Sequence, residues 1–223
     1  MVAYEKELIE VLRALNESGA LKHCIVSGSW AMWFYQRVFL DFTPRIETSD
    51  LDLYLPNPKT ARGEGLSGEL RKLSYIRSDD CLTGKTTFVS ASGFEIEFLT
   101  VPDRTMSNVI RVPGLSLGAE ALPKMAPVGW NYIEVEIDNL VVKVVSPASF
   151  VMQKLLINQE RKPESKREKD LDAVRYVLTF VKASHKYSDE LKTSIESSPK
   201  KWKKAILDAA KNNGIELTNA LLA

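Results

Sequence analysis

The stretch Ser49-Asp50-Leu51-Asp52-Leu53-Tyr54-Leu55 begins with strictly alternating acidic and apolar residues. Side chains at positions i and i+2 of a β-strand point to the same face of a sheet. The pattern therefore predicts a strand that carries Asp50 and Asp52 on one face and packs its leucines into a core on the other.

Two carboxylates on one strand face repel each other unless a cation neutralises them. Mg²⁺ prefers oxygen ligands and usually binds through one or two carboxylates together with substrate phosphates. A pair of such ions can activate an attacking hydroxyl and stabilise a leaving pyrophosphate. Asp50 and Asp52 are therefore candidate metal ligands, and the alternative is an acidic strand face that is simply exposed to solvent.

A second acidic pair, Glu95 and Glu97, alternates with apolar residues in the same way. If this strand lies beside the Asp50 strand, one of the two glutamates can complete a trio of carboxylates. Glu134 and Glu136 repeat the pattern, and there it is typical of a surface strand with acidic side chains. Periodicity alone does not separate these two pairs.

The segment Ser27-Gly28-Ser29 follows a short apolar run and precedes a helical pattern rich in aromatic residues. A helix N-terminus presents unpaired N–H groups and a positive partial charge, both of which favour phosphate. Gly28 allows the backbone to approach a ligand closely, and the Ser29 hydroxyl can donate to a phosphate oxygen. Ordinary capping of the helix by serine is the alternative.

Two other glycine-containing stretches fail as phosphate-binding motifs. Gly84-Lys85-Thr86 resembles the end of a P-loop, but Asp79 stands where its first glycine is required. Gly63-x-Gly65-x-x-Gly68 is separated from the nearest predicted strand by a loop, so it lacks the context of a dinucleotide-binding turn.

Composition sets wider limits on the protein. Its 223 residues, 44% hydrophobic content and net charge of +1 fit a globular protein of one large or two small domains. The segment from Lys154 to Lys204 carries an excess of about six positive charges, which suits a negatively charged substrate. Cys24 and Cys81 lack metal-site spacing and predict reduced thiols in a cytoplasmic protein. We expect no signal peptide, and no apolar run approaches the roughly 20 residues of a membrane span.

Hydrophobic periodicity predicts an α+β fold in two parts. Residues 1–145 form a mixed α/β domain, with helices at 3–18, after Ser29 and at 69–76, strands at 21–27, 51–55, 86–90 and 94–100, and a hairpin at 134–145. Residues 146–223 form a helical lobe, which begins with Ser146 as N-cap and Pro147 as first helical residue. Further helices are predicted at 166–183 and 187–213.

Taken in chain order, three segments resemble the minimal DNA polymerase β-like nucleotidyltransferases. They are Ser27-Gly28-Ser29-Trp30-Ala31, Arg45-x-x-Thr48-Ser49-Asp50-Leu51-Asp52-Leu53 and Glu95-Ile96-Glu97-Phe98-Leu99. The nearest branch is the one that includes the toxins of type IV toxin–antitoxin systems. The resemblance covers residues 21–178 and extends to Ser146-Pro147…Lys154 and Lys169-Asp170-Leu171-Asp172. Ser27 replaces the usual first glycine, and Glu97 replaces the usual aspartate.

The resemblance implies a nucleotidyltransferase-like mixed sheet with flanking helices, followed by a helical lobe. It implies Mg²⁺ or Mn²⁺ as cofactor, an NTP such as ATP as substrate, and a cognate antitoxin as a partner. It favours Glu97 over Glu95 as the third carboxylate, which would ligate the catalytic metal and help to deprotonate the acceptor. The implied site consists of metal ligands Asp50, Asp52 and Glu97 and of nucleotide-binding residues Gly28, Ser29, Lys154, Lys169 and Asp170.

The sequence therefore predicts a Mg²⁺-dependent enzyme that moves a nucleoside monophosphate from an NTP to a hydroxyl and releases pyrophosphate. The acceptor is left open among RNA, protein and small molecules. Trp202, which lies among four lysines, either stacks on RNA bases or packs inward. The alternative class is a non-catalytic nucleotide-binding or partner-binding module on the same fold.

Overall fold

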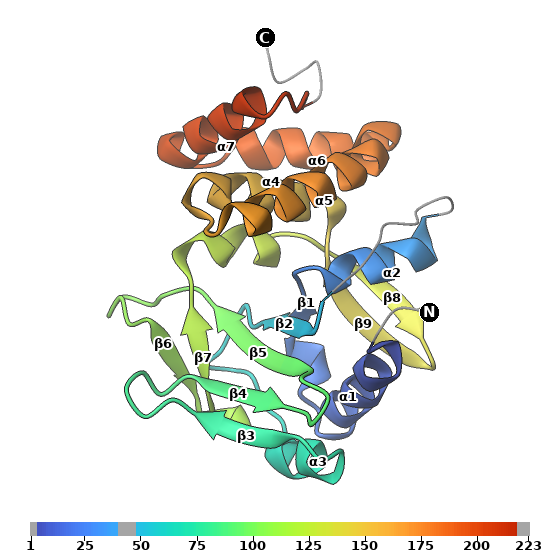
Figure 1. Ribbon diagram of the computed structural model, residues 1–223, viewed down its shortest axis with the longest axis vertical. Coiled ribbons are helices and arrows are strands. Elements are labelled where there is room, and N and C mark those ends of the chain that lie inside the picture. The colour runs from blue at the N-terminus through green and yellow to red at the C-terminus, as the bar shows by residue number, and fades with distance from the viewer. Residues whose placement is uncertain (1–3, 40–47, 218–223) are drawn as a thin grey trace. The chain divides into compact units, whose positions relative to one another are not determined.

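The computed structural model describes residues 4–39 and 48–217 (Figure 1). The described residues form two compact units, one that ends at Val145 and one that begins at Ser146. The first unit is built on a mixed sheet and the second consists of helices. Arg45 lies outside the described residues. No described helix combines the length and apolar character needed to cross a membrane.

A nine-stranded sheet forms the first unit, in the order β3-β4-β5-β2-β1-β9-β8, with β7 joining β5 to β6. The pairs β2–β5, β1–β9 and β5–β7 are parallel and the remaining pairs are antiparallel. The predicted fold class is confirmed. The strands are β1 (Ile25–Val26), β2 (Asp50–Tyr54), β3 (Ile76–Asp79), β4 (Thr86–Val89), β5 (Glu95–Thr100), β6 (Val109–Val112), β7 (Leu117–Ala121), β8 (Tyr132–Ile137) and β9 (Leu140–Val145).

The central strands divide their faces as the alternation predicts. Leu51 and Leu53 of β2 and Phe98 of β5 are completely buried, and each such side chain stabilises the fold by about 1.5–3 kcal/mol relative to an exposed position. The acidic residues between them point to the other face. The core of the first unit therefore fixes which face of β2 and β5 carries the carboxylates.

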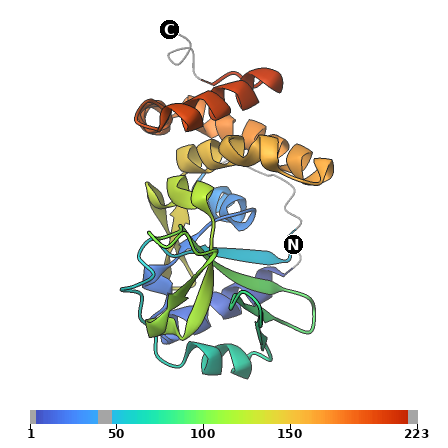
Figure 2. The same ribbon diagram turned by 90° about the vertical axis from the view of Figure 1, so that its left-hand side faces the viewer.

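Three α-helices accompany the described part of this sheet: α1 (Glu5–Glu17), α2 (Trp30–Val38) and α3 (Leu66–Lys72). Leu8, Leu12 and Leu15 form the buried stripe of α1, and α1 packs beside α3 (Figure 2). Helix α2 buries its aromatic residues, and the rings of Trp30 and Trp33 meet edge to face at 6.1 Å. Short 3₁₀ turns are formed by η1 (Leu21–His23), η2 (Pro113–Leu115) and η3 (Pro123–Gly129).

The predicted hairpin at 134–145 is confirmed. Asp138 and Asn139 connect β8 to β9 with φ angles of 48° and 63°. A two-residue turn with positive φ at both positions matches the twist of antiparallel strands, and Asp and Asn tolerate that conformation. Glu134 and Glu136 are exposed on β8, as expected of a surface strand.

Two predicted elements of the first unit are wrong in extent, and three strands were not predicted. Residues 21–23 form a 3₁₀ turn, so β1 keeps only two residues of the strand predicted at 21–27. Helix α3 begins after Gly65, whose φ is 68°, and ends at Lys72, earlier than predicted. Strand β3 was not predicted, and it begins at Ile76, where the sequence predicted the end of a helix. Strands β6 and β7 were not predicted either, because Pro113, Gly114 and Gly118 weaken the strand pattern there.

The second unit is a helical bundle built around α4 (Pro147–Ile157), which contacts α5 (Glu164–Ala183), α6 (His185–Glu196) and α7 (Lys200–Asn212). The Ser146 side chain accepts a hydrogen bond from the Ser149 amide, so the predicted N-cap is confirmed. The single helix predicted at 187–213 is wrong: it breaks at Ser197–Pro199, because Pro199 cannot continue a helical hydrogen-bond ladder. The short turn η4 (Asn158–Glu160) follows α4.

Candidate active site

Strands β2 and β5 place four carboxylates in a 2 × 2 array. The strands are parallel neighbours, with Asp50 opposite Glu95 and Asp52 opposite Glu97. Residues paired in register point to the same face, so all four side chains share the face opposite the leucine core. The sequence left the adjacency of the two acidic strands as a condition for a carboxylate trio, and the structure meets it.

The array is electrostatically crowded. Burial, Glu97 and Asp50 together raise the pKa of Glu95 above its ordinary value. Asp50 is exposed, whereas Asp52, Glu95 and Glu97 are half-buried. The Ser49 hydroxyl donates to Asp50 at 3.1 Å. Such a face has excess negative charge that a bound cation would relieve.

The turn between β1 and α2 lies against Asp52. The Ser27 amide donates to the Asp52 carbonyl at 2.9 Å, and the Ser27 hydroxyl reaches the same oxygen at 3.3 Å. Gly28 has a φ of 62°, and a Cβ at this position would lie 3.1 Å from Asp52 Cγ and would overlap with Oδ2. Ser27 thus ties the β1–α2 turn to β2. At Gly28, the backbone of this turn lies against the Asp52 carboxylate.

Helix α2 begins directly beside this contact. Its hydrogen-bond ladder starts with the Ala31 amide, which donates to the Gly28 carbonyl at 3.3 Å. The amides of Ser29 and Trp30 therefore precede the ladder and are the ones a helix N-terminus offers to an anion. Ser29 occupies the N-cap position, but its side chain makes no capping hydrogen bond. The Ser29 hydroxyl therefore does not cap α2.

Lys85 is a member of the site that sequence reasoning missed. Its Nζ lies 2.5 Å from Glu97 Oε1 and 2.7 Å from Glu120 Oε2. Burial lowers the pKa of Lys85, but the hydrogen bonds that its ammonium group donates to Glu120 and Glu97, together with their negative charges, outweigh it, and the pKa is raised overall. Thr87 pairs with Glu97 across β4 and β5. Lys85 lies two residues before Thr87 and so on the same face of the sheet as Glu97. This spacing is the signal from which its place near Glu97 could have been predicted.

Lys154, Lys169 and Asp170 belong to the second unit. Lys154 Nζ lies 2.7 Å from Asp170 Oδ1, and Arg161 Nε lies 3.1 Å from Oδ2 of the same carboxylate. Lys154 and Asp170 are only 7% and 5% exposed, whereas Lys169 is exposed. In this arrangement Asp170 joins α5 to α4. The nucleotide-binding roles of these three residues stay predictions.

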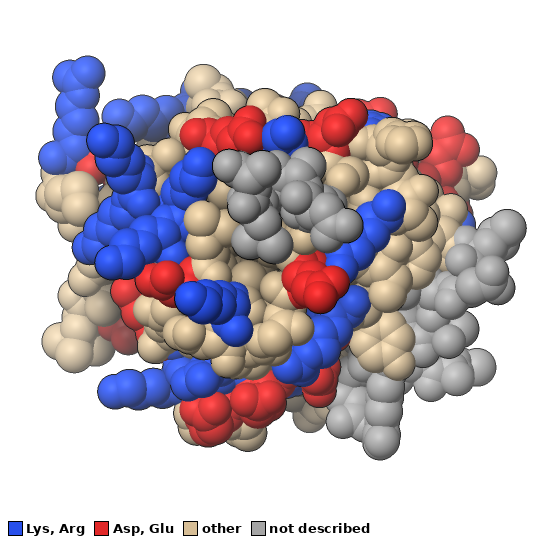
Figure 3. All heavy atoms as spheres, turned by 90° about the horizontal axis from the view of Figure 1, so that it is seen from above, with Lys and Arg blue, Asp and Glu red and all other residues tan. Residues whose placement is uncertain are grey.

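Basic residues of the second unit include those around Trp202. Lys200, Lys201 and Lys204 are exposed, and Trp202 is half-buried. Lysine and arginine side chains on this part of the surface are interspersed with acidic ones (Figure 3). Trp202 is therefore neither fully exposed nor fully packed inward.

The donor set suits a hard divalent cation. Asp50, Asp52 and Glu97 offer the carboxylate oxygens that Mg²⁺ prefers. Across residues 4–39 and 48–217, no three acidic, histidine or cysteine side chains are already gathered closely enough to hold a metal ion. Glu97 in particular is engaged by Lys85. The residues thus fit a metal in chemistry, and the third ligand would have to exchange partners.

Residues 6–199 match the sequence model of a protein family described as Nucleotidyltransferase. The match spans most of the chain and includes every carboxylate of the array. The chain therefore belongs to this nucleotidyltransferase family. A search of curated protein sequences found no significant match.

Solved structures share the fold at low sequence identity. An antigenic nucleotidyltransferase-like protein from Paracoccidioides brasiliensis is 13% identical, with a TM-score of 0.55 over 96% of this chain and 91% of that one. The solution structure of the antibiotic-resistance factor ANT(2″)-Ia is 14% identical, with a TM-score of 0.52 over 96% of this chain and 100% of that one. A crystal structure of ANT(2″)-Ia with adenylyl-2″-tobramycin is 13% identical, with a TM-score of 0.50 over 93% and 97%.

Proposed function

We propose that this protein transfers a nucleoside monophosphate from an NTP to a hydroxyl acceptor. In that reaction the acceptor oxygen forms a bond to the α-phosphorus, the bond to the β-phosphate bridge breaks, and pyrophosphate leaves. The observation that carries the proposal is the array of Asp50, Asp52, Glu95 and Glu97, with Asp52 in contact with the glycine that precedes α2. Membership of the nucleotidyltransferase family supports it.

The residues divide the work by their chemistry. Asp50, Asp52 and Glu97 would hold Mg²⁺ or Mn²⁺, which when bound supplies charge stabilisation to the reacting phosphate. The amides at the start of α2 and the Ser29 hydroxyl would bind the β- and γ-phosphates. Glu97 would accept the proton of the attacking hydroxyl. In the second unit, Lys154, Lys169 and Asp170 are the further nucleotide-binding candidates.

The acceptor is proposed at the level of chemical class, as a hydroxyl on RNA, on a protein or on a small molecule. One structural neighbour, ANT(2″)-Ia, was crystallised in complex with adenylyl-2″-tobramycin, which makes aminoglycosides one member of a test panel. Membership of the toxin–antitoxin branch would add a cognate antitoxin as a partner and leave the acceptor open.

The test is incubation with each of the four NTPs, labelled at the α-phosphate, with Mg²⁺ and one of three acceptor pools. The pools are total RNA, the protein fraction of a lysate, and a small-molecule filtrate supplemented with aminoglycosides. We expect label to move to one pool, with pyrophosphate released in equal amount. The variant Asp50→Asn/Asp52→Asn is the control, and equal labelling by this variant contradicts the proposal.

The second candidate is a non-catalytic nucleotide-binding or partner-binding module. One observation favours it: Glu97 is held by Lys85 and so is not available as a ligand in this arrangement. Calorimetry with Mg²⁺-ATP separates the two functions. Binding that is lost in Asp50→Asn/Asp52→Asn, with no product in any pool, would identify the module.

A further inference from the structure

Lys85 lies between a proposed metal ligand and a carboxylate that is outside the proposed metal site. It contacts Glu97 on β5 and Glu120 on β7 at nearly equal distances, 2.5 Å and 2.7 Å. The three side chains are partly buried, with 24–33% of their surface exposed. A lysine with two alternative carboxylate partners can release one of them and remain paired with the other.

The hairpin loop before Lys85 is tightly closed. The Asp80 amide donates to the Lys85 carbonyl and the Gly84 amide to the Asp80 carbonyl, each at 2.8 Å. Asp80 Oδ1 accepts from the amides of Leu82 and Thr83, also at 2.8 Å. Gly84 adopts a φ of 79°, which a residue with a side chain rarely does. The loop therefore presents Lys85 in a defined direction.

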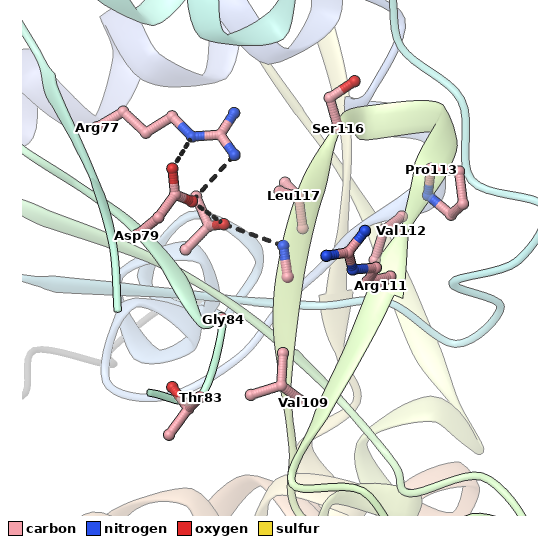
Figure 4. Close-up of a pocket in the computed structure, with 12 residues that line it drawn as sticks. Arg77, Asp79, Thr83, Gly84, Val109, Arg111, Val112, Pro113, Ser116 and Leu117 are labelled. Carbon is pink, nitrogen blue, oxygen red and sulfur yellow. Dashed lines mark hydrogen bonds and ion pairs between the residues drawn. The ribbon is translucent and has the colours of Figure 1, made fainter. Parts of the chain in front are cut away.

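The β3–β4 hairpin that contains this loop is hydrogen-bonded to β7, the strand that carries Glu120. Thr86 Oγ1 donates to Asp79 at 2.6 Å and accepts from the Gly118 amide at 3.0 Å (Figure 4). A Cβ at Gly118 would overlap with the Gly84 carbonyl, so a glycine is needed for this close approach. Beside the hydrogen bond between Thr86 and Gly118, a pocket of 580 Å³ lies between the β3–β4 and β6–β7 hairpins. Lys85 and Glu120 are thus held together independently of Glu97.

We propose that Lys85 is a positioning residue that exchanges partners when the divalent cation binds. Before binding, its ammonium group neutralises Glu97 and holds that carboxylate at the array. On binding, Glu97 turns to the cation, and Lys85 stays paired with Glu120 because a cation and an ammonium group repel each other. This inference rests on the proposed function, since it assumes that Asp50, Asp52 and Glu97 receive the cation.

The exchange predicts opposite effects of two substitutions on cation affinity. Lys85→Met removes the competitor for Glu97, so Mn²⁺ should bind about tenfold more tightly, as expected for the loss of one nearby positive charge. Glu120→Gln leaves Lys85 with Glu97 as its remaining carboxylate, so Mn²⁺ should bind more weakly. Lys85→Met/Glu120→Gln should match Lys85→Met, because Glu120 acts through the lysine.

The experiment is a Mn²⁺ titration of the full chain without nucleotide, followed by the electron paramagnetic resonance signal of the free ion. Wild type, the three variants above and Lys85→Arg are compared, and Lys85→Arg should resemble wild type. Unchanged or weaker binding by Lys85→Met overturns the inference. So does a double variant in which the two single effects simply add, because plain through-space electrostatics would then account for both.

One further variant separates this inference from the proposed function. Asp50→Asn/Asp52→Asn should lose the Mn²⁺ site. If it binds Mn²⁺ as wild type does, the cation is elsewhere, and both the metal site and the exchange are wrong. If it loses binding while Lys85→Met fails to tighten binding in the otherwise intact chain, the exchange alone is wrong and the proposed function stands.

Discussion

Asp52 Oδ2 occupies the space that a Cβ at position 28 would need. This contact joins the two halves of the candidate site, because Gly28 leads into α2 and Asp52 lies in the carboxylate array. The amides proposed to bind phosphate and the oxygens proposed to bind metal are thereby set side by side by one turn of backbone. The absence of a side chain at Gly28 is what permits it.

Gly28→Ala should therefore damage the site far more than it damages the fold. A left-handed backbone with a Cβ costs about 1–2 kcal/mol, and the new methyl group must also displace Asp52. We expect nucleotidyl transfer to fall at least about 100-fold, since small misplacements of reacting groups have effects of this size. Activity and urea unfolding measure the two consequences separately.

Gly65→Ala is the matched control for that substitution. Gly65 has a φ of 68° against 62° for Gly28, but a Cβ there meets nothing within 4 Å. We expect a similar loss of stability and nearly unchanged activity. Equal losses of activity in both variants would mean that the contact with Asp52 has no special role.

The two glutamates of β5 should differ in their importance. Glu97 is opposite Asp52, the residue that contacts Gly28, whereas Glu95 is opposite the exposed Asp50. Glu97→Gln should lower kcat for nucleotidyl transfer about 10²–10³-fold, which is the usual effect of removing a group that stabilises charge in the transition state. Glu95→Gln should lower it less than about tenfold, with Glu134→Gln on β8 as an unaffected control. The reverse ranking in steady-state kinetics would assign the third ligand to Glu95.

Much of this architecture could be predicted because it depends on local patterns. Alternation fixed the faces of β2 and β5, and Asp138-Asn139 marked a turn that needs positive φ at both positions. Serine followed by proline at 146 marked the start of α4. Each of these signals is contained within a few residues, so one sequence is enough to detect it.

The parts that could not be predicted depend on residues distant in sequence. Lys85 meets Glu120 because β4 and β7 both pair with β5, at different parts of its length. Nothing in the local sequence of Lys85 indicates that pairing. In the same way, Lys154 meets Asp170 through the packing of α4 against α5, whereas the family resemblance implied nucleotide-binding roles for both residues and not a contact between them.

The Lys154–Asp170 pair should be important for stability of the second unit. Both side chains are buried, and removal of one partner from a buried pair costs about 3–5 kcal/mol because the other charge is left uncompensated. Asp170→Asn should show this loss in urea unfolding. Lys154→Met/Asp170→Leu should recover most of it, because no buried charge is left and Arg161, the other partner of Asp170, is 38% exposed and can be solvated.

Asp172→Asn provides the comparison on the same helix. Asp172 pairs with Arg175, but their side chains are 70% and 47% exposed, so the substitution should change the free energy of unfolding by less than about 1 kcal/mol. If Asp170→Asn costs no more than Asp172→Asn, the Lys154–Asp170 pair is solvated in solution and contributes little.

Glu190 should make the stability of the second unit depend on pH. Burial raises the pKa of Glu190 above its ordinary value of 4.5, and this outweighs the lowering effects of the Ser146 hydroxyl and Lys186. The folded state therefore binds this proton more tightly than the unfolded state does. The resulting stabilisation is complete below pH 4.5 and is lost as the pH rises through the raised pKa of the folded state.

Glu190→Gln tests this sign directly, because an amide resembles the protonated acid and does not titrate. Relative to wild type, the variant should gain stability as the pH rises from below 4.5 through the raised pKa, and the difference should then level off. Urea unfolding at a series of pH values measures it. Asp189→Asn, at an exposed neighbouring position, should show no such trend. A difference between Glu190→Gln and wild type that is constant across the range, or that runs in the opposite direction, would show that burial does not control this carboxyl group.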